Sequence, residues 1–232
     1  MKVSKRIKNL RKSVDIKKEY SIDNAIATLQ SSTNAKFVES LDCAIKLGID
    51  PKKAEQMIRS TVILPHGIGK TVRVLVMTPT KAQEALDAGA DYAGYTDYIE
   101  KIKGGWADID VVIATPDAMA EVGKLGKILG PRGLMPNPKS GTVTPDVAKA
   151  VRESKAGKIE FRNEKAGIVH VGLGKINFTS EQLKDNALAF LHTIARMKPA
   201  AVKGQYIKSC YLSTTMGVGL KISSDELAVL SK

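Results

Sequence analysis

The sequence predicts two folding units of different class: an α+β domain formed by both ends of the chain and an α/β domain inserted between them. Near both ends, apolar residues alternate with polar ones, which is typical of half-buried antiparallel strands. In the middle, continuous apolar runs alternate with helical patterns, as in a parallel sheet with helices on both faces. The formal net charge of +12 is also uneven, because residues 1–68 carry +6, residues 159–232 carry +4 and residues 69–158 only +2. We therefore expect a basic domain made of the two ends and a near-neutral domain of residues 69–158.

Two helices are expected at the N-terminal end. In the first, apolar residues recur at three- and four-residue spacing with Lys and Arg between them. These apolar residues are Val3, Ile7, Leu10 and Val14. The helix therefore has one apolar stripe and a cationic outer face. The second helix opens at Ser21, a favoured N-cap residue.

The apolar period then changes to two, which predicts a half-buried strand over residues 37–47. Phe37 falls on the same side as the apolar residues that follow it, so the alternation alone predicts a buried ring. Gly48 ends this strand, and another strand covers about 58–64.

The middle of the chain predicts strands at 72–77 and 110–115, with helices at 82–86, after Pro116 and at 145–155. Alternating strands then return at 159–162, 168–173, 205–214 and 218–222, and an amphipathic helix covers 180–197. The chain passes between the two domains near Gly67, Gly69 and Gly157. Paired glycine-rich crossings would permit hinge motion, and a rigid interface is the alternative.

An enzyme is disfavoured. Lys70 and Thr71 follow Gly69 as in a phosphate loop, but Leu64 stands where that loop needs its first glycine. The loop also needs a helix directly after it, and here a strand is predicted. The insertion lacks a G-x-G-x-x-G segment, and the three histidines lie far apart without metal-ligand spacing. We expect no cofactor, no metal and no small-molecule substrate; a nucleotide-dependent enzyme using the α/β insertion is the alternative.

A cytoplasmic protein is expected from three further observations. The sequence has no run of eighteen apolar residues, and its first residues do not develop the apolar stretch of a secretory signal. Cys43 and Cys210 lie in strand-like alternation and are expected to be free thiols, as in a reducing compartment. A disulfide between them is the less favoured alternative.

The basic domain points to a polyanionic partner, because cationic surfaces attract phosphates and release their counterions. Nucleic acid and an anionic membrane both fit, and a merely solvated surface is the alternative. The segment Ser-Thr-Thr-Met-Gly at 213–217 offers hydroxyls, an apolar pad and close backbone approach to RNA; a polar hairpin tip is its alternative. Lys36 and Phe37 offer a cation beside an aromatic ring. His170 follows a turn and is expected on an exposed face.

The segment 130–143 is rich in Gly and Pro, which excludes helix or strand in its first half. Leu134 and Met135 make it partly apolar, and Arg132 and Lys139 add charge. We expect it to pack against the other domain or a ligand, with an ordinary surface loop as the alternative. Gly130, Arg132, Met135 and Lys139 are its candidate residues.

Four segments together resemble a known family. They are Gly-Ile-Asp-Pro at 48–51, Leu-Pro-His-Gly-Ile-Gly-Lys at 64–70, the segment 130–143, and Ser-Thr-Thr-Met-Gly at 213–217. In this order and spacing they closely resemble large-subunit ribosomal protein one of bacteria and organelles. The resemblance implies a discontinuous α+β domain with an inserted Rossmann-like three-layer α/β domain. It also implies binding of large-subunit ribosomal RNA at the mobile side stalk, near the exit site for deacylated tRNA.

The resemblance further implies the partners and the binding residues. The partners would be large-subunit ribosomal RNA, exit-site tRNA whose release it helps, its own operon mRNA, whose translation it would repress, and other ribosomal components, with no membrane. The RNA-binding residues would be Lys36, Phe37, Ser40, Lys165, His170, Thr215, Met216 and Gly217. At position 40 the family is expected to have Thr, and Ser40 keeps the hydroxyl but loses a methyl group. Under this reading Phe37 is a contact residue and not part of the core.

Overall fold

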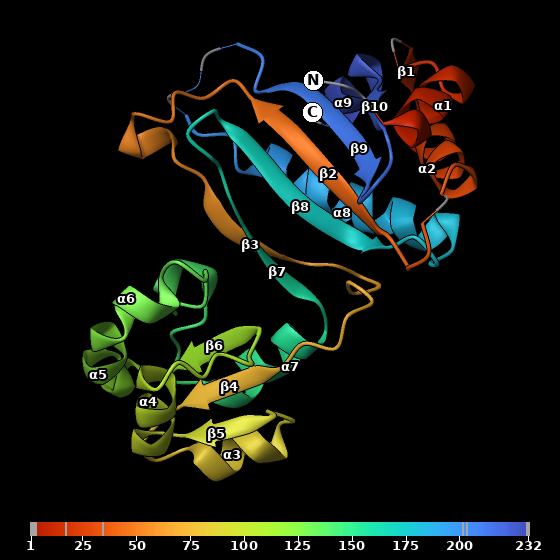
Figure 1. The fold of residues 1–232 in the computed structure, drawn as a ribbon. Coiled ribbons are helices and arrows are strands. Elements are labelled where there is room, and N and C mark those ends of the chain that lie inside the picture. The colour runs from red at the N-terminus through yellow and green to blue at the C-terminus, as the bar shows by residue number, and fades with distance from the viewer. Residues whose placement is uncertain (1–3, 17, 34, 201, 203, 231–232) are drawn as a thin grey trace. The chain divides into compact units, whose positions relative to one another are not determined.

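The structure of the chain is a computed structural model that describes residues 4–16, 18–33, 35–200, 202 and 204–230 (Figure 1). Val3, the first apolar residue of the predicted N-terminal helix, lies outside this part. The chain divides into two compact units, which we call the terminal unit (residues 1–69 and 161–232) and the inserted unit (residues 70–160). The fold is mixed α and β, and its described residues form three sheets.

A five-stranded sheet forms the centre of the terminal unit, in the order β1-β10-β9-β2-β8. Its strands are β1 (Glu19–Tyr20), β2 (Ser40–Leu47), β8 (Ile168–Lys175), β9 (Ile207–Thr214) and β10 (Gly219–Ile222). β2 pairs antiparallel with both β8 and β9, so the N-terminal part of the chain lies between two strands from its C-terminal part. β10 is antiparallel to β9, and β1 is parallel to β10.

Helices cover one face of this sheet. The helices of the terminal unit are α1 (Lys5–Ser13), α2 (Ile22–Ser31), α8 (Ser180–Arg196) and α9 (Ser224–Leu230). α2 contacts β9 and β10, and α8 contacts β8 and lies behind the sheet in Figure 1. The buried side chains of β2 alternate with half-exposed ones, which gives the sheet one apolar face and one polar face. The apolar side chains of β2 are Leu41, Cys43, Ile45 and Leu47.

The inserted unit has a three-stranded parallel sheet in the order β5-β4-β6. Its strands are β4 (Val74–Met77), β5 (Tyr92–Gly94) and β6 (Val111–Ala114), and its helices are α3 (Ala82–Asp87), α4 (Thr96–Lys103), α5 (Met119–Lys124), α6 (Gly126–Leu129) and α7 (Val147–Lys155). Residues of α4, α5 and α6 form one core with Leu75 and Met77 of β4. α3 and α7 also contact β4, whose four residues are all buried. A parallel strand buried on both faces explains the continuous apolar run in the sequence.

A separate two-stranded sheet is formed by β3 (Arg59–Ile63) and β7 (Lys158–Arg162). Short 3₁₀ turns cover η1 (Ala54–Gln56), η2 (Pro116–Ala118) and η3 (Pro138–Ser140). Cys43 and Cys210 are free and buried, with their sulfur atoms 3.6 Å apart. The hydrogen bond with Cys210, together with burial, raises the pKa of the Cys43 thiol well above its ordinary value.

The burial predicted for Phe37 from strand alternation is wrong. β2 begins at Ser40, three residues later than predicted, and Phe37 is 55% exposed. The core position ahead of Leu41 is taken by Glu39, which is only 2% exposed. Its backbone carbonyl accepts a hydrogen bond from Ile176 N–H, which continues the pairing with β8 one residue beyond Ser40 and Lys175, and Phe37 lies outside this pairing.

The glycines predicted at the crossings all have positive φ: 65° at Gly67, 69° at Gly69 and 98° at Gly157. This backbone region favours glycine because it has no Cβ. Gly67 is also anchored, because its carbonyl accepts a hydrogen bond of 3.0 Å from the buried Asn186 side chain. The positive φ values account for these glycines, and hinge motion stays a prediction.

Candidate nucleic-acid interface

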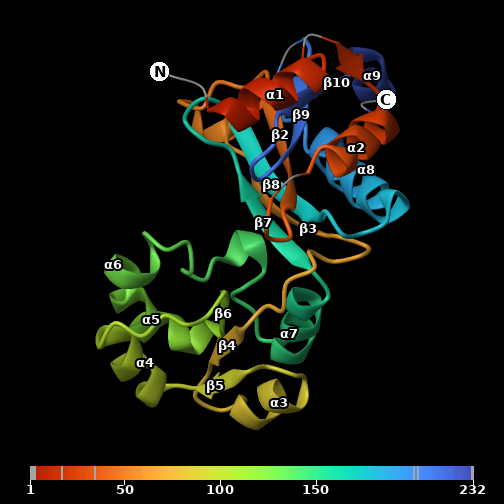
Figure 2. The ribbon, with the colours of Figure 1, turned by 45° about the vertical axis from the view of Figure 1, so that its right-hand side comes forward.

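The polar face of the five-stranded sheet is the candidate interface of the terminal unit. We call it the open face; α8 lies on the opposite side of the sheet, and α1 lies near the β1–β10 edge (Figures 1 and 2). Its residues are Ser40, Asp42, Ala44 and Lys46 of β2, His170 and Gly172 of β8, Ser209, Tyr211 and Ser213 of β9, and Lys221 of β10. All are half-exposed or exposed.

A set of hydrogen bonds joins the ends of three strands at one edge of the open face. The Thr215 hydroxyl accepts from Ser40 N–H at 3.0 Å, and Ser40 C=O accepts from Thr215 N–H at 3.1 Å. The ammonium group of Lys175 donates to the Ser40 hydroxyl at 2.9 Å. Ser40 therefore links the two segments that the sequence singled out, although they lie 175 residues apart.

Exposed apolar side chains surround this point. Phe37, Val38 and Met216 are 55%, 50% and 44% exposed. Met216 N–H lies 3.4 Å from the carboxylate of the buried Glu39, which ties the 215–217 turn to the segment before β2. Large apolar side chains held at the surface beside hydroxyls and a lysine suit the sugar and base faces of RNA.

Gly217 allows the turn after β9 to close tightly. A Cβ at this position would lie 2.2 Å from the Thr214 hydroxyl, whose residue is buried. Gly217 N–H donates to Thr214 C=O at 3.1 Å. Thr215 and Met216 are thereby presented at the tip of the turn.

Lys165 and His170 lie away from this point. Lys165 occupies the turn between β7 and β8 and is exposed, whereas Ser40 pairs with Lys175 at the other end of β8. His170 lies midway along β8, opposite Ala44, with its Nε2 atom 3.9 Å from a carboxylate oxygen of Glu164. The structure therefore brings together Ser40, Thr215, Met216 and Gly217. Lys36, which is exposed, and Phe37 lie just before β2.

The sequence alone did not single out two residues of the open face as candidate site residues. Tyr211 is 41% exposed, and its position between the buried Cys210 and Leu212 was the available signal. Asp42 lies beside Gly172, where an added Cβ would come within 3.4 Å of its carboxylate. Burial raises the pKa of Asp42, and the positive charges of Lys175 and His170 oppose this rise.

The segment 130–143 packs within its own unit. Leu134 and Met135 contact the core of the inserted unit, so the expectation of packing onto another partner is not needed to explain them. A Cβ at Gly130 would lie 2.5 Å from the carbonyl of Gly126. Arg132 and Lys139 are exposed. The Asn137 side chain accepts from Lys139 N–H at 2.8 Å, which orders η3.

The lysine after Gly69 is engaged within the inserted unit. Lys70 Nζ lies 2.6 Å from Asp110, and β4 follows without an intervening helix. The hydrogen bond from Lys70, together with those from Arg73, lowers the pKa of Asp110. The described residues contain no group of three or more His, Cys, Asp or Glu placed to hold a metal ion. No helix in the described part has the length and apolar character to span a bilayer.

Comparison with known proteins identifies the relatives of this chain. Residues 29–218 match the model of the Ribosomal protein L1p/L10e family. The large ribosomal subunit protein uL1 of Bacteroides fragilis is 56% identical over 222 residues, which are 95% of this chain and 96% of the relative. The uL1 proteins of Bacteroides thetaiotaomicron and Chlorobaculum tepidum are 54% and 52% identical, covering 97% and 96% of this chain and 99% and 96% of theirs.

Proposed function

This chain belongs to the ribosomal protein L1p/L10e family, and on that premise we propose that it binds large-subunit ribosomal RNA as a structural constituent of the large ribosomal subunit. Its relatives are ribosomal proteins and not enzymes, so the nucleotide-dependent enzyme is set aside. The proposal rests on the similarity of this chain to large ribosomal subunit proteins over nearly their whole length.

The proposed contact surface is the Ser40–Thr215 junction with its exposed apolar side chains. Three features support it. The hydrogen bonds hold the 215–217 turn against Ser40, so the surface is formed before RNA arrives. Phe37 and Met216 expose apolar area that a sugar or base can cover. Lys175 places a cation at the same point. Lys165, in the turn before β8, and His170, midway along β8, would contact RNA away from this junction.

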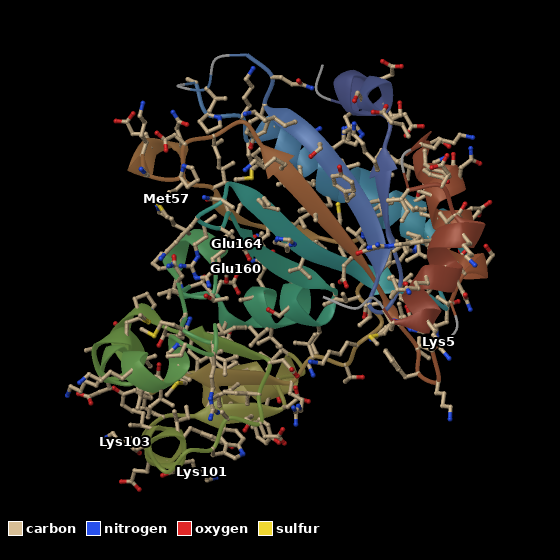
Figure 3. All side chains as sticks on the ribbon, turned by 45° about the horizontal axis from the view of Figure 1, so that its top comes forward. Lys5, Met57, Lys101, Lys103, Glu160 and Glu164 are labelled. Carbon is tan, nitrogen blue, oxygen red and sulfur yellow. The ribbon has the colours of Figure 1, made fainter. Side chains whose placement is uncertain are left out.

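Long-range attraction is assigned to α1. The helix carries Lys5, Arg6, Lys8, Arg11 and Lys12, and no acidic residue lies in its first turn. Figure 3 shows Lys5 at the outer end of this helix. Such a cluster attracts phosphates without reading sequence. We thus separate attraction by α1 from recognition at the Ser40–Thr215 junction.

The finer roles are part of the same proposal. The protein would sit at the mobile side stalk and help release deacylated tRNA from the exit site. It would also repress translation by binding its own operon mRNA through the same surface. The two units would act as a basic RNA-binding domain and an inserted Rossmann-like three-layer α/β domain. Parallel strands β5-β4-β6 with helices contacting them support that classification.

A binding experiment with the full chain tests the proposal. Transcripts of large-subunit and small-subunit ribosomal RNA are titrated in parallel, and the bound region is mapped by chemical footprinting. We expect tight binding and one footprint on the large-subunit transcript alone. Equal affinity for both transcripts would contradict the proposal. A third arm with the operon mRNA leader tests repression, which requires that it compete with the ribosomal RNA.

A further inference from the structure

A row of four side chains crosses the open face away from the Ser40–Thr215 junction. The strand register places Lys221, Tyr211, Ala44 and His170 next to one another on four neighbouring strands. The Tyr211 residue is 41% exposed and the His170 side chain 55% exposed. Ala44 contributes only a methyl group between them. Because side chains stand nearly perpendicular to a sheet, Tyr211 and His170 rise on either side of Ala44, and we call the space above the Ala44 methyl group the gap.

The gap has the width of one planar group. β9 and β8 both pair with β2, so their backbones are separated by two strand spacings, about 9.6 Å. One ring held between two others needs two van der Waals contacts, or about 7–8 Å. Two stacked rings would need three contacts, about 10.5–12 Å, which exceeds the gap.

One end of the gap carries a carboxylate. Asp42 precedes Ala44 by two residues and lies on the same face of β2. Its neighbour across the ladder is Gly172, whose missing side chain leaves room for the carboxylate. No side chain among the described residues donates a hydrogen bond to the Asp42 carboxylate; burial raises its pKa, and Lys175 and His170 oppose this rise. A half-buried carboxylate in this state gains most from a ligand that brings N–H donors.

The carboxylate distinguishes between parts of an RNA chain. It repels a phosphate, so the group that enters the gap is a base. Guanine presents two adjacent donors, N1–H and the N2 amino group, which match the two oxygens of a carboxylate. Adenine, cytosine and uracil each present only one donor group on the corresponding edge. Two parallel hydrogen bonds to an ionised group are stronger and more selective than one.

We propose that the gap above Ala44 binds one unstacked guanine of RNA, held between Tyr211 and His170 with its N1 and N2 donors on Asp42. This guanine subsite rests on the proposed RNA-binding function and extends it. It is continuous with the Ser40–Thr215 junction, because Asp42 pairs with Ser213 and the next pair is Leu41 with Thr214. Lys221 lies at one end of the row, where its ammonium group pairs with Glu19 at 2.7 Å, and the ammonium group of Lys46 donates to the carbonyl of Ala166.

The first test fills the gap. Ala44→Leu places a branched side chain between the two rings. Ala27→Leu is the matched control, because Ala27 is exposed on α2, a helix that packs on the opposite face of the sheet. Each full-length variant is bound to the large-subunit transcript and, separately, to the operon mRNA leader. The bound RNA is then probed with kethoxal, which modifies N1 and N2 of unpaired guanines.

We expect one guanine to be protected by the wild-type protein and by Ala27→Leu. Ala44→Leu should leave that guanine reactive and weaken binding about 10-fold or more, because a single hydrogen bond to a charged group already accounts for about 10-fold and the excluded guanine loses two. Protection on the ribosomal transcript but not the leader would assign the subsite to ribosomal RNA; protection on both would make it common to the two.

The second test removes one donor from the RNA. Inosine lacks the N2 amino group, so replacing the protected guanosine by inosine should weaken wild-type binding about 10- to 150-fold. Replacing the guanosine by inosine should change the affinity of the Asp42→Asn variant only slightly, because the carboxylate that accepts from N2 is already absent. This test does not depend on whether Ala44→Leu folds.

The outcomes separate the two proposals. If the wild-type protein does not bind the large-subunit transcript, the proposed function fails and the subsite with it. If the wild-type protein binds but Ala44→Leu folds and behaves like Ala27→Leu, the subsite alone is overturned. Equal inosine effects on the wild-type protein and on Asp42→Asn would overturn it as well.

Discussion

The Thr215 hydroxyl accepts a hydrogen bond from the backbone N–H of Ser40 and holds the turn after β9 against the start of β2. The reciprocal bond from Thr215 N–H to Ser40 C=O extends the ladder one residue beyond its last pair, Leu41 with Thr214. Hydroxyls in this segment were expected to face RNA directly. The Thr215 hydroxyl also supports the geometry of the proposed contact surface, so its replacement tests both fold and binding.

Thr215→Val should weaken binding to the large-subunit transcript by about 1–3 kcal/mol, because Ser40 N–H loses its acceptor and the turn shifts. Thr215→Ser keeps the hydroxyl and should bind within a factor of about three of wild type, since the acceptor remains. Titration of both variants, with thermal unfolding to verify folding, measures the effect. Unchanged affinity in a folded Thr215→Val protein would remove this junction from the RNA contact.

Gly217→Ala should destabilise the terminal unit by about 1–3 kcal/mol, because the new Cβ would meet the buried Thr214 hydroxyl. Gly219→Ala is the matched control, since nothing lies within 4 Å of an added Cβ there. Urea unfolding followed by circular dichroism compares the two. If both variants were equally stable, the turn would have room that its geometry does not show.

The sequence predicted elements best where one kind of burial governs the whole segment. The continuous apolar run at 72–77 became β4, buried on both faces, and the alternating run ending at Leu47 became the central strand β2. The burial predicted for Phe37 was wrong, because an alternation of apolar and polar residues does not show at which residue the strand begins. There the chain turns out of the sheet and the carboxylate-bearing Glu39 takes the buried position.

The site was predictable only in part for a similar reason. Residues 213–217 stood out by composition, and the resemblance added Ser40, yet no local pattern shows that their backbones exchange hydrogen bonds. Tyr211 could have been found from the alternation of β9. Asp42 could not, because its importance depends on Gly172, a neighbour 130 residues away that only the register brings next to it.

Asp110→Asn should destabilise the inserted unit at neutral pH by up to about 1 kcal/mol, since its ion pairs are partly screened. The hydrogen bond from Lys70 lowers the pKa of Asp110 in the folded state. The stabilisation is therefore present above the pKa of the unfolded chain and is lost as pH falls through the lower, folded pKa. The difference between wild type and variant should vanish at acidic pH.

Fluorescence of Trp106 measures this effect, because it is the one tryptophan of the chain and packs against the core of the inserted unit. Asp117→Asn is the control, an exposed carboxylate on η2. A wild-type–variant difference that stayed constant from neutral to acidic pH would show that the Asp110 ion pairs are not its source.

Replacing Lys5, Lys8 and Lys12 of α1 by Gln should weaken RNA binding and flatten its salt dependence. Each lost phosphate contact should reduce the slope of log affinity against log salt by about 0.7–0.9. The control removes the same charge from the inserted unit by replacing Lys101, Lys103 and Lys127 by Gln (Figure 3 labels the first two). The footprint should keep its position in both triple variants. A larger slope change from the control would assign attraction to the inserted unit instead.

Removal of residues 70–160 tests whether the terminal unit alone carries ribosomal RNA recognition. A Gly/Ser linker of about ten residues, with a root-mean-square span of about 16–19 Å, joins Gly69 to Phe161. We expect the shortened protein to fold and to keep its footprint, because the open face and the Ser40–Thr215 junction lie entirely within the terminal unit. Circular dichroism establishes folding before the titration. A folded protein that no longer binds the large-subunit transcript would show that recognition needs residues of the inserted unit, and the separation of attraction and recognition within the terminal unit would then be wrong.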